Sequence, residues 1–111
     1  MEKKLYPFKY VLINIERFPW DALLYLPKEG KWTLESPCAI LMPDLDVEDE
    51  EADPEFAVQN NLRYALLFSD LQQIVENAKE QIPNANEELL FKAFMFYYDN
   101  DAFIEFTDEA P

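Results

Sequence analysis

The sequence predicts an α+β domain: a small, mostly antiparallel sheet of about three strands, with one N-terminal helix and two C-terminal helices packed on it. Three short apolar runs of strand length lie between residues 22 and 68, and stretches with helical apolar spacing lie before and after them. This segregation of helices from strands is typical of α+β folds. The chain has 111 residues, of which 50% are apolar, so we expect a single domain over residues 1–111 with one core.

The first helix is expected over residues 7–18. Pro7 suits a first helical turn, and Pro19 ends the pattern because the residue before a proline avoids the helical conformation. Apolar residues recur between them at helical spacing, at Phe8, Val11, Leu12, Ile15 and Phe18.

Two apolar runs, residues 22–26 and 38–42, are each followed by a proline and are expected to form a hairpin or neighbouring strands. Gly30 is the only glycine of the chain, and we expect it to take a positive φ in a turn at residues 28–31. Residues 32–34 are expected to begin the return strand.

A third strand is predicted over residues 62–68, after a helical turn at residues 56–60. The sequence then matches a capping box, with Ser69 as the N-cap and Gln72 three residues later. The helix that follows stops at Pro83. Its apolar face consists of Leu71, Ile74, Val75, Ala78 and Ile82.

The last predicted helix begins after Asn86, a suitable N-cap, and extends to about Tyr98. Residues 101–106 are expected to form an edge strand or a packed tail. The inner stripe of this helix consists of Leu90, Ala93, Phe94 and Tyr97.

The charge is concentrated in two segments. The chain has 9 Lys and Arg against 23 Asp and Glu, a net charge of −14. Residues 44–55 contain eight acids and residues 99–111 contain five, with no base in either segment, so they hold 13 of the 14 excess charges. We therefore expect no binding to nucleic acid through phosphates and none to anionic membranes.

Several chemistries are excluded by residue type. Without histidine there is no Ser–His–Asp triad and no histidine metal site, and the single Cys38 allows no internal disulfide or cysteine zinc site. Cys38 is expected to be a buried, inert thiol. Nothing singles out two of the 23 carboxylates for acid–base catalysis, so neither an enzyme nor a cofactor is expected.

No apolar run reaches the roughly 18 residues of a membrane span, and no signal peptide is evident, so a cytoplasmic protein is expected.

The acidic loop at residues 44–55 has three interpretations. Its acids match several calcium-ligand positions of an EF-hand, but Asp49 stands where that motif requires glycine, so calcium is disfavoured. A loop that steers a basic partner and a merely solvated loop both remain open. Trp20 and Trp32 flank the first strand and are expected in the core, with a surface platform as the alternative.

Residues 97–105 interleave aromatic rings with carboxylates, which is typical of a hot spot that meets Arg and Lys on a partner. The alternative places Tyr97, Phe103 and Ile104 in the core. We prefer the core for these apolar residues and a binding role for Asp99 and Asp101.

The chain contains the segments Phe18-Pro19-Trp20, Leu24-Tyr25-Leu26-Pro27, Trp32, Val75-x-Asn77-Ala78-x-x-Gln81, Ala93-Phe94 and Tyr97-Tyr98-x-x-Asp101-Ala102-Phe103-Ile104. With these segments it resembles a group of small acidic bacterial proteins of uncharacterised function. In size and acidity it also looks like the immunity proteins of contact-dependent growth inhibition and polymorphic toxin systems. Those proteins bind a toxin domain, often a nuclease, and occlude its active site; this likeness is one of type and assigns no residues.

The sequence thus predicts a cytoplasmic immunity protein that neutralises a basic toxin, expected to be a nuclease. The alternative is an adaptor or DNA-mimic protein that binds other basic proteins. The residues expected to bind the partner are Asp44, Asp46, Glu48, Asp49, Asp99 and Asp101, with Tyr98 as an aromatic anchor.

Overall fold

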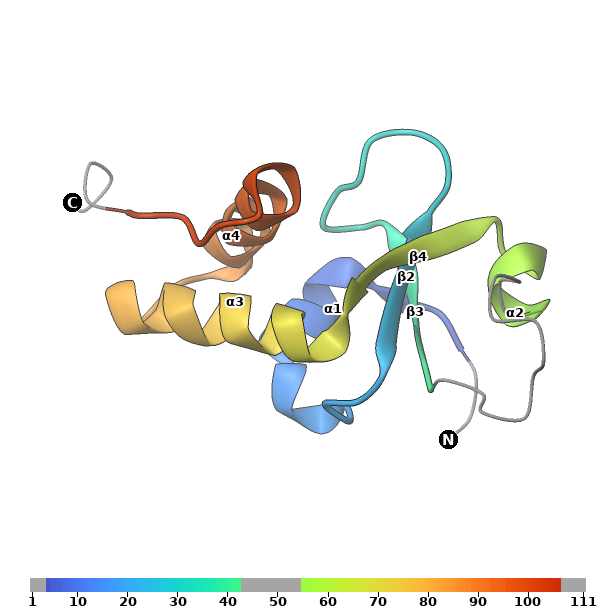
Figure 1. Cartoon of the computed structure of the whole chain (residues 1–111), viewed down its shortest axis with the longest axis horizontal. Helices are drawn as coiled ribbons and strands as arrows, with labels where there is room; N and C mark the ends of the chain where they lie inside the picture. The colour runs from blue at the N-terminus through green and yellow to red at the C-terminus, as the bar shows by residue number, and fades with distance from the viewer. Residues whose placement is uncertain (1–3, 43–54, 107–111) are drawn as a thin grey trace.

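A computed structural model describes residues 4–42 and 55–106, which form one antiparallel sheet with helices on both faces (Figure 1). The strand order is β1-β3-β2-β4. This architecture confirms the predicted α+β class, with four strands in place of about three. The elements are β1 (Tyr6–Pro7), α1 (Phe8–Ile13), the 3₁₀ helix η1 (Ile15–Arg17), β2 (Leu23–Pro27), β3 (Pro37–Leu41), α2 (Glu55–Gln59), β4 (Leu62–Leu67), α3 (Phe68–Gln81) and α4 (Glu87–Asn100).

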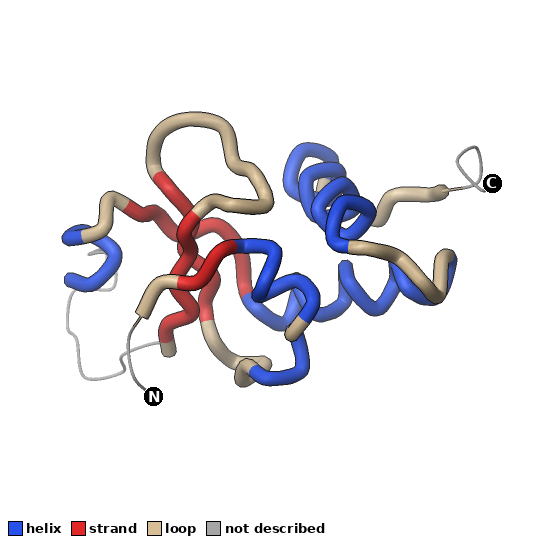
Figure 2. Tube along the Cα trace, turned by 180° about the vertical axis from the view of Figure 1, so that it is seen from behind, coloured by secondary structure: helices blue, strands red, loops and turns tan. Residues whose placement is uncertain are grey.

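The sheet separates two hydrophobic clusters, because successive side chains of a strand point to opposite faces. Leu24 and Leu26 of β2 belong to the larger cluster, whereas Leu23 and Tyr25 belong to or pack against the smaller one. Figure 2 shows α1, α3 and α4 on one side of the sheet and α2 on the other. The smaller cluster includes Ala57 of α2, so the short helix covers part of the second face.

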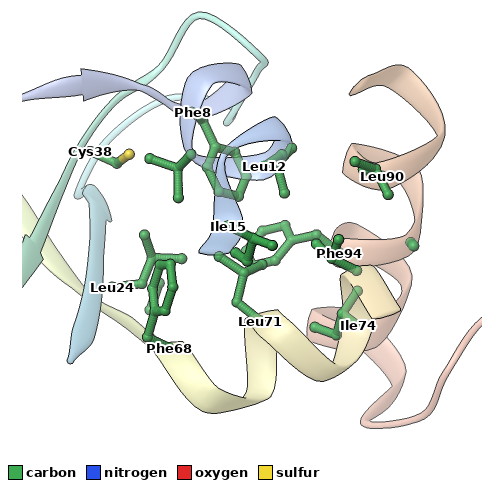
Figure 3. Close-up of a cluster of buried hydrophobic side chains, with 14 of the residues drawn as sticks. Phe8, Leu12, Ile15, Leu24, Cys38, Phe68, Leu71, Ile74, Leu90 and Phe94 are labelled. Atoms are coloured by element: carbon green, nitrogen blue, oxygen red, sulfur yellow. The ribbon is translucent and has the colours of Figure 1, made fainter. Parts of the chain in front are cut away.

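The larger cluster forms the main core (Figure 3). Phe8 of α1 lies at its centre, where its ring meets that of Phe94 of α4 edge-on at 4.9 Å between centroids. Leu24 from the sheet and Phe68 and Leu71 from α3 complete the contact between the layers. Cys38 of β3 is buried in the same core, as predicted.

The first predicted helix is shorter than expected. The α-helix ends at Ile13, and the residues after Asn14 form η1. The backbone of Asn14 leaves the helical conformation at φ −120° and ψ 34°. Its backbone N–H makes the last helical bond, to the Tyr10 carbonyl at 3.0 Å, and its side-chain amide donates to the same carbonyl at 2.9 Å. Every residue of the predicted apolar stripe is nevertheless buried.

The predicted capping box is wrong. The helix α3 begins at Phe68, and its N-cap Leu67 makes no side-chain hydrogen bond, so Ser69 lies inside the helix. The Phe68 N–H donates to the Ala22 carbonyl at 3.0 Å and the Phe68 ring is fully buried. These tertiary contacts fix the start of the helix directly after β4. The predicted end is confirmed, because the helix stops at Gln81, before Pro83.

The other N-cap is confirmed: the side chain of Asn86 accepts the Leu89 N–H at 3.0 Å. The helix α4 runs to Asn100, two residues beyond the predicted end. Residues 101–106 form a packed tail rather than a strand, with Ile104 and Phe106 buried.

Two strand predictions need correction. Residues 32–34 form no strand, because Thr33 and Ser36 close a turn through Thr33 N–H to Ser36 Oγ at 2.8 Å, and β3 begins only at Pro37. The short strand β1 was not predicted, and its Tyr6 lies opposite Cys38.

The strand β4 carries a bulge. Leu24 of β2 lies opposite Leu66, and Tyr25 lies opposite Tyr64, so Ala65 has no partner across the ladder. The predicted positive φ of Gly30 is confirmed, at 83°. Within the described residues, none of the helices has the length and apolar character that crossing a bilayer requires.

Candidate functional site

Two of the predicted binding residues lie at the C-terminal end of α4. Asp99 and Asp101 are both exposed. Asp101 is the C-cap in the left-handed region, at a φ of 53°, and its N–H donates to the Tyr97 carbonyl at 2.7 Å. Within residues 4–42 and 55–106, neither carboxylate has an ion-pair partner.

This placement of negative charge is locally unfavourable. The C-terminal end of a helix carries a partial negative charge, and acidic side chains there cost about 0.3–1 kcal/mol each. The last turn of α4 contains no basic residue that would offset this cost. Departures from local stability rules are expected at functional sites, and this one is relieved when a cation approaches the helix end.

The predicted anchor Tyr98 is half-buried. Its ring meets Trp32 edge-on at 4.8 Å and stacks on Phe94 at 6.0 Å, both measured between ring centroids. The guanidinium of Arg63 lies 5.1 Å from the centre of the Trp32 ring. Much of the Tyr98 ring is therefore occupied within the protein.

Phe103 is the exposed ring of this region. Its side chain is 41% exposed and packs against Tyr97 at 5.4 Å between centroids. The preference for a core position was wrong for Phe103, right for Ile104, which is buried, and right in part for Tyr97, which is half-buried.

The start of α3 adds a third carboxylate to the electrostatics of this region. Burial raises the pKa of Tyr97, and the charges of Asp70 and Asp101 raise it further. We call the residues Tyr97, Asp99, Asp101 and Phe103 the α4-end surface. It presents unpaired carboxylates beside an exposed ring, an arrangement that suits Arg or Lys side chains of another protein.

The other predicted binding residues, Asp44, Asp46, Glu48 and Asp49, lie outside the described residues. Among the 13 acidic and 8 basic residues that the structure describes, the net charge is −5, so most of the excess negative charge belongs to the rest of the chain.

Trp20 was expected in the core, and the structure places it on the surface. Its side chain is 70% exposed, more than any other large hydrophobic residue among those described. Trp32 packs against the core, as expected: its Nε1 donates to the Pro27 carbonyl at 2.9 Å, and its ring packs on Phe94. The position of Trp20 after Pro19, outside the helical stripe, was the available signal.

A groove of about 590 Å³ lies between η1 and α3, away from the predicted residues. Within the part of the chain that the structure covers, no cluster of three or more metal-ligating side chains occurs. The burial of Cys38 raises its pKa to about 12, so its thiol stays protonated at neutral pH.

The family model of a domain of unknown function (DUF7716) matches residues 5–106. Comparison with curated proteins and with solved structures gives no match.

Proposed function

The chain belongs to the family described as a domain of unknown function (DUF7716), and we propose that it works by binding a basic protein. In its specific form, the proposal is that the protein is a cytoplasmic immunity protein. It neutralises a bacterial toxin by covering the basic surface of the toxin's active site.

The observation that supports this proposal is the pair of unpaired carboxylates, Asp99 and Asp101, beside the exposed Phe103 ring. Tight interfaces combine a desolvated aromatic anchor with charge-assisted hydrogen bonds. The net charge of −14 adds a long-range attraction that speeds association with a basic partner.

The proposed mechanism is steric and electrostatic. A nuclease holds the phosphates of its substrate with Arg and Lys side chains. Carboxylates of the α4-end surface take the place of those phosphates and accept the same hydrogen bonds, while Phe103 covers apolar surface nearby. The toxin is then unable to bind nucleic acid.

The proposal is tested by affinity capture from a lysate of the source organism, followed by a growth assay. The native protein is expected to retain one basic protein through a high-salt wash, and co-expression is expected to abolish the toxicity of that protein. The double variant D99N/D101N is expected to lose both properties.

The matched control is E29Q/E88Q, which removes the same charge at two exposed sites away from the α4-end surface. Equal loss in both double variants would contradict the site. Several weakly held partners would indicate an adaptor, and many DNA-binding proteins displaced by added DNA would indicate a DNA mimic.

A further inference from the structure

The groove between η1 and α3 has an apolar floor and a charged rim. Its floor includes Ile15 and Val75, which are largely buried, and its rim includes the exposed carboxylates of Glu16, Glu76 and Glu80. The volume of about 590 Å³ lies within the range of ligand-binding clefts in proteins.

Regular structure fixes both walls. On α3, the lining residues from Gln72 to Glu80 follow the spacing of one helical face, with Val75 at the base. The Nε2 of Gln72 donates to the Phe18 carbonyl at 3.4 Å, which ties α3 to the chain just after η1. The groove therefore exists before any partner binds.

The rim carries unpaired negative charge. Glu76 and Glu80 are four residues apart on one helix, where like charges repel, and Glu16 faces them from η1. Among the described residues, none of the three carboxylates has an ion-pair partner, and Lys79 on the same wall pairs with none of them.

An apolar floor below carboxylates matches the side chains of Arg and Lys, which have an apolar stem and a cationic head. We propose that this groove binds an Arg or Lys side chain from an extended basic segment of a protein partner. The charge complementarity selects a cation, and the floor selects one with a hydrocarbon stem.

The shape of the surface favours a peptide chain over a small molecule. A second hollow of about 190 Å³ adjoins the groove, shares Ile15, Glu16 and Lys79 with it, and includes Ile13, which is 54% exposed. The two hollows together extend along η1 from Ile13 to Arg17, which gives room for more than one residue of an extended chain. Arg17 lines only this second hollow, whereas the groove beside α3 has three carboxylates against the single cation of Lys79, so the cation site lies in the groove beside α3.

The inference is independent of the proposed function. The groove shares no residue with the α4-end surface, and a basic segment of any protein would fit it.

The test titrates ¹⁵N-labelled protein with the peptide acetyl-RARARAR-amide at physiological salt and follows the amide resonances. We expect the largest shifts at residues 15–16 and 72–80. The variant E16Q/E76Q/E80Q is expected to raise the Kd about tenfold. Each exposed ion pair changes the Kd by less than about tenfold, and this variant removes three carboxylates together.

The matched control is E29Q/E55Q/E88Q, which has the same net charge and alters three exposed glutamates away from the groove. We expect it to raise the Kd less than about threefold. Equal weakening by both triple variants, or shifts centred on the α4-end surface, would overturn the proposal. A second titration uses spermine, a small polycation. If spermine binds in the groove at least as tightly as the peptide does, the assignment to a protein segment is overturned.

Discussion

The side-chain amide of Gln81 pairs with the backbone of Phe106: its Oε1 accepts the Phe106 N–H at 2.9 Å. The Nε2 of Gln81 donates to the Ile104 carbonyl at 2.7 Å and also to Asn77 Oδ1 at 2.8 Å. One side chain thus supplies the hydrogen bonds that a neighbouring strand would otherwise make. The tail of residues 101–106 remains attached to α3 without being part of the sheet.

We expect Q81A to lower the free energy of unfolding by about 1–3 kcal/mol, because two hydrogen bonds to the partly buried tail are lost. Urea denaturation measures the change. The control is Q73A, at an exposed position of the same helix, which should stay within about 0.5 kcal/mol. Equal effects of the two variants would show that Gln81 does not hold the tail.

The two predicted N-caps should respond differently to truncation. N86A removes an observed capping bond and should cost about 1 kcal/mol of stability. S69A removes a side chain that caps nothing and should change stability by less than about 0.5 kcal/mol. The same denaturation assay measures both, and a larger loss in S69A would contradict the observed start of α3.

The variant D99N/D101N should be more stable than the native protein while it binds the proposed partner more weakly. Removing both charges relieves their repulsion with the helix end, by about 0.3–1 kcal/mol at each site. Asparagine also suits the left-handed conformation of residue 101. Thermal denaturation checks the direction, and a destabilised variant would contradict the argument.

Trp20 and Trp32 should differ in how much each contributes to stability and in how accessible each is to a fluorescence quencher. W20A should leave stability within about 0.5 kcal/mol, because the side chain is mostly exposed. W32A should cost about 2 kcal/mol or more, since it removes a hydrogen bond and contacts to Phe94 and Tyr98. Acrylamide should quench W32F, which retains Trp20, more strongly than W20F.

Stability should decrease as the pH rises from about 9 to about 12. Burial raises the pKa of the Cys38 thiol from 9.0 to about 12, so the unfolded chain loses this proton at a lower pH than the folded one. One such group contributes a slope of at most about 1.4 kcal/mol per pH unit. Urea denaturation across this range measures the slope, which below pH 9 should no longer depend on Cys38.

The variant C38A should have a shallower slope over the same pH range. Part of the slope should persist, because burial also raises the pKa of Tyr64 and of Tyr97, with the charge of Asp70 adding to both shifts. An unchanged slope in C38A would mean that the thiol is not the titrating group.

The sequence was a good guide wherever a local pattern carries the information. The apolar runs of β2 and β3 and the helical stripes of α3 and α4 bury most of the residues that their spacing predicts. The run of β4 buries fewer, since Tyr64 and Leu67 are exposed. The strand β1 has only two residues and depends on pairing with Cys38, 32 positions further along the chain from Tyr6, so no local pattern reveals it. The start of α3 was missed because the contacts of Phe68 outweigh the capping preference of Ser69.

The candidate site was likewise predictable where local sequence was sufficient and unpredictable where tertiary packing decides. Counting charges was enough to select Asp99 and Asp101, which are exposed and unpaired among the described residues. Which neighbouring ring is exposed depends on the path of the tail, which buries Ile104 and leaves Phe103 outside. The groove between η1 and α3 could not be predicted from the sequence, because Glu16 and Glu76 line the same groove only as a result of tertiary packing.

The unpartnered Ala65 has a consequence for self-assembly. The strand β4 is an edge of the described sheet, and an uninterrupted edge invites the strand of another copy to extend the ladder into a fibre. The bulge at Ala65 breaks the hydrogen-bonding register in the middle of that edge, and β1 at the opposite edge is only two residues long. Together with the mutual repulsion of chains that each carry a charge of −14, this disfavours edge-to-edge polymerisation.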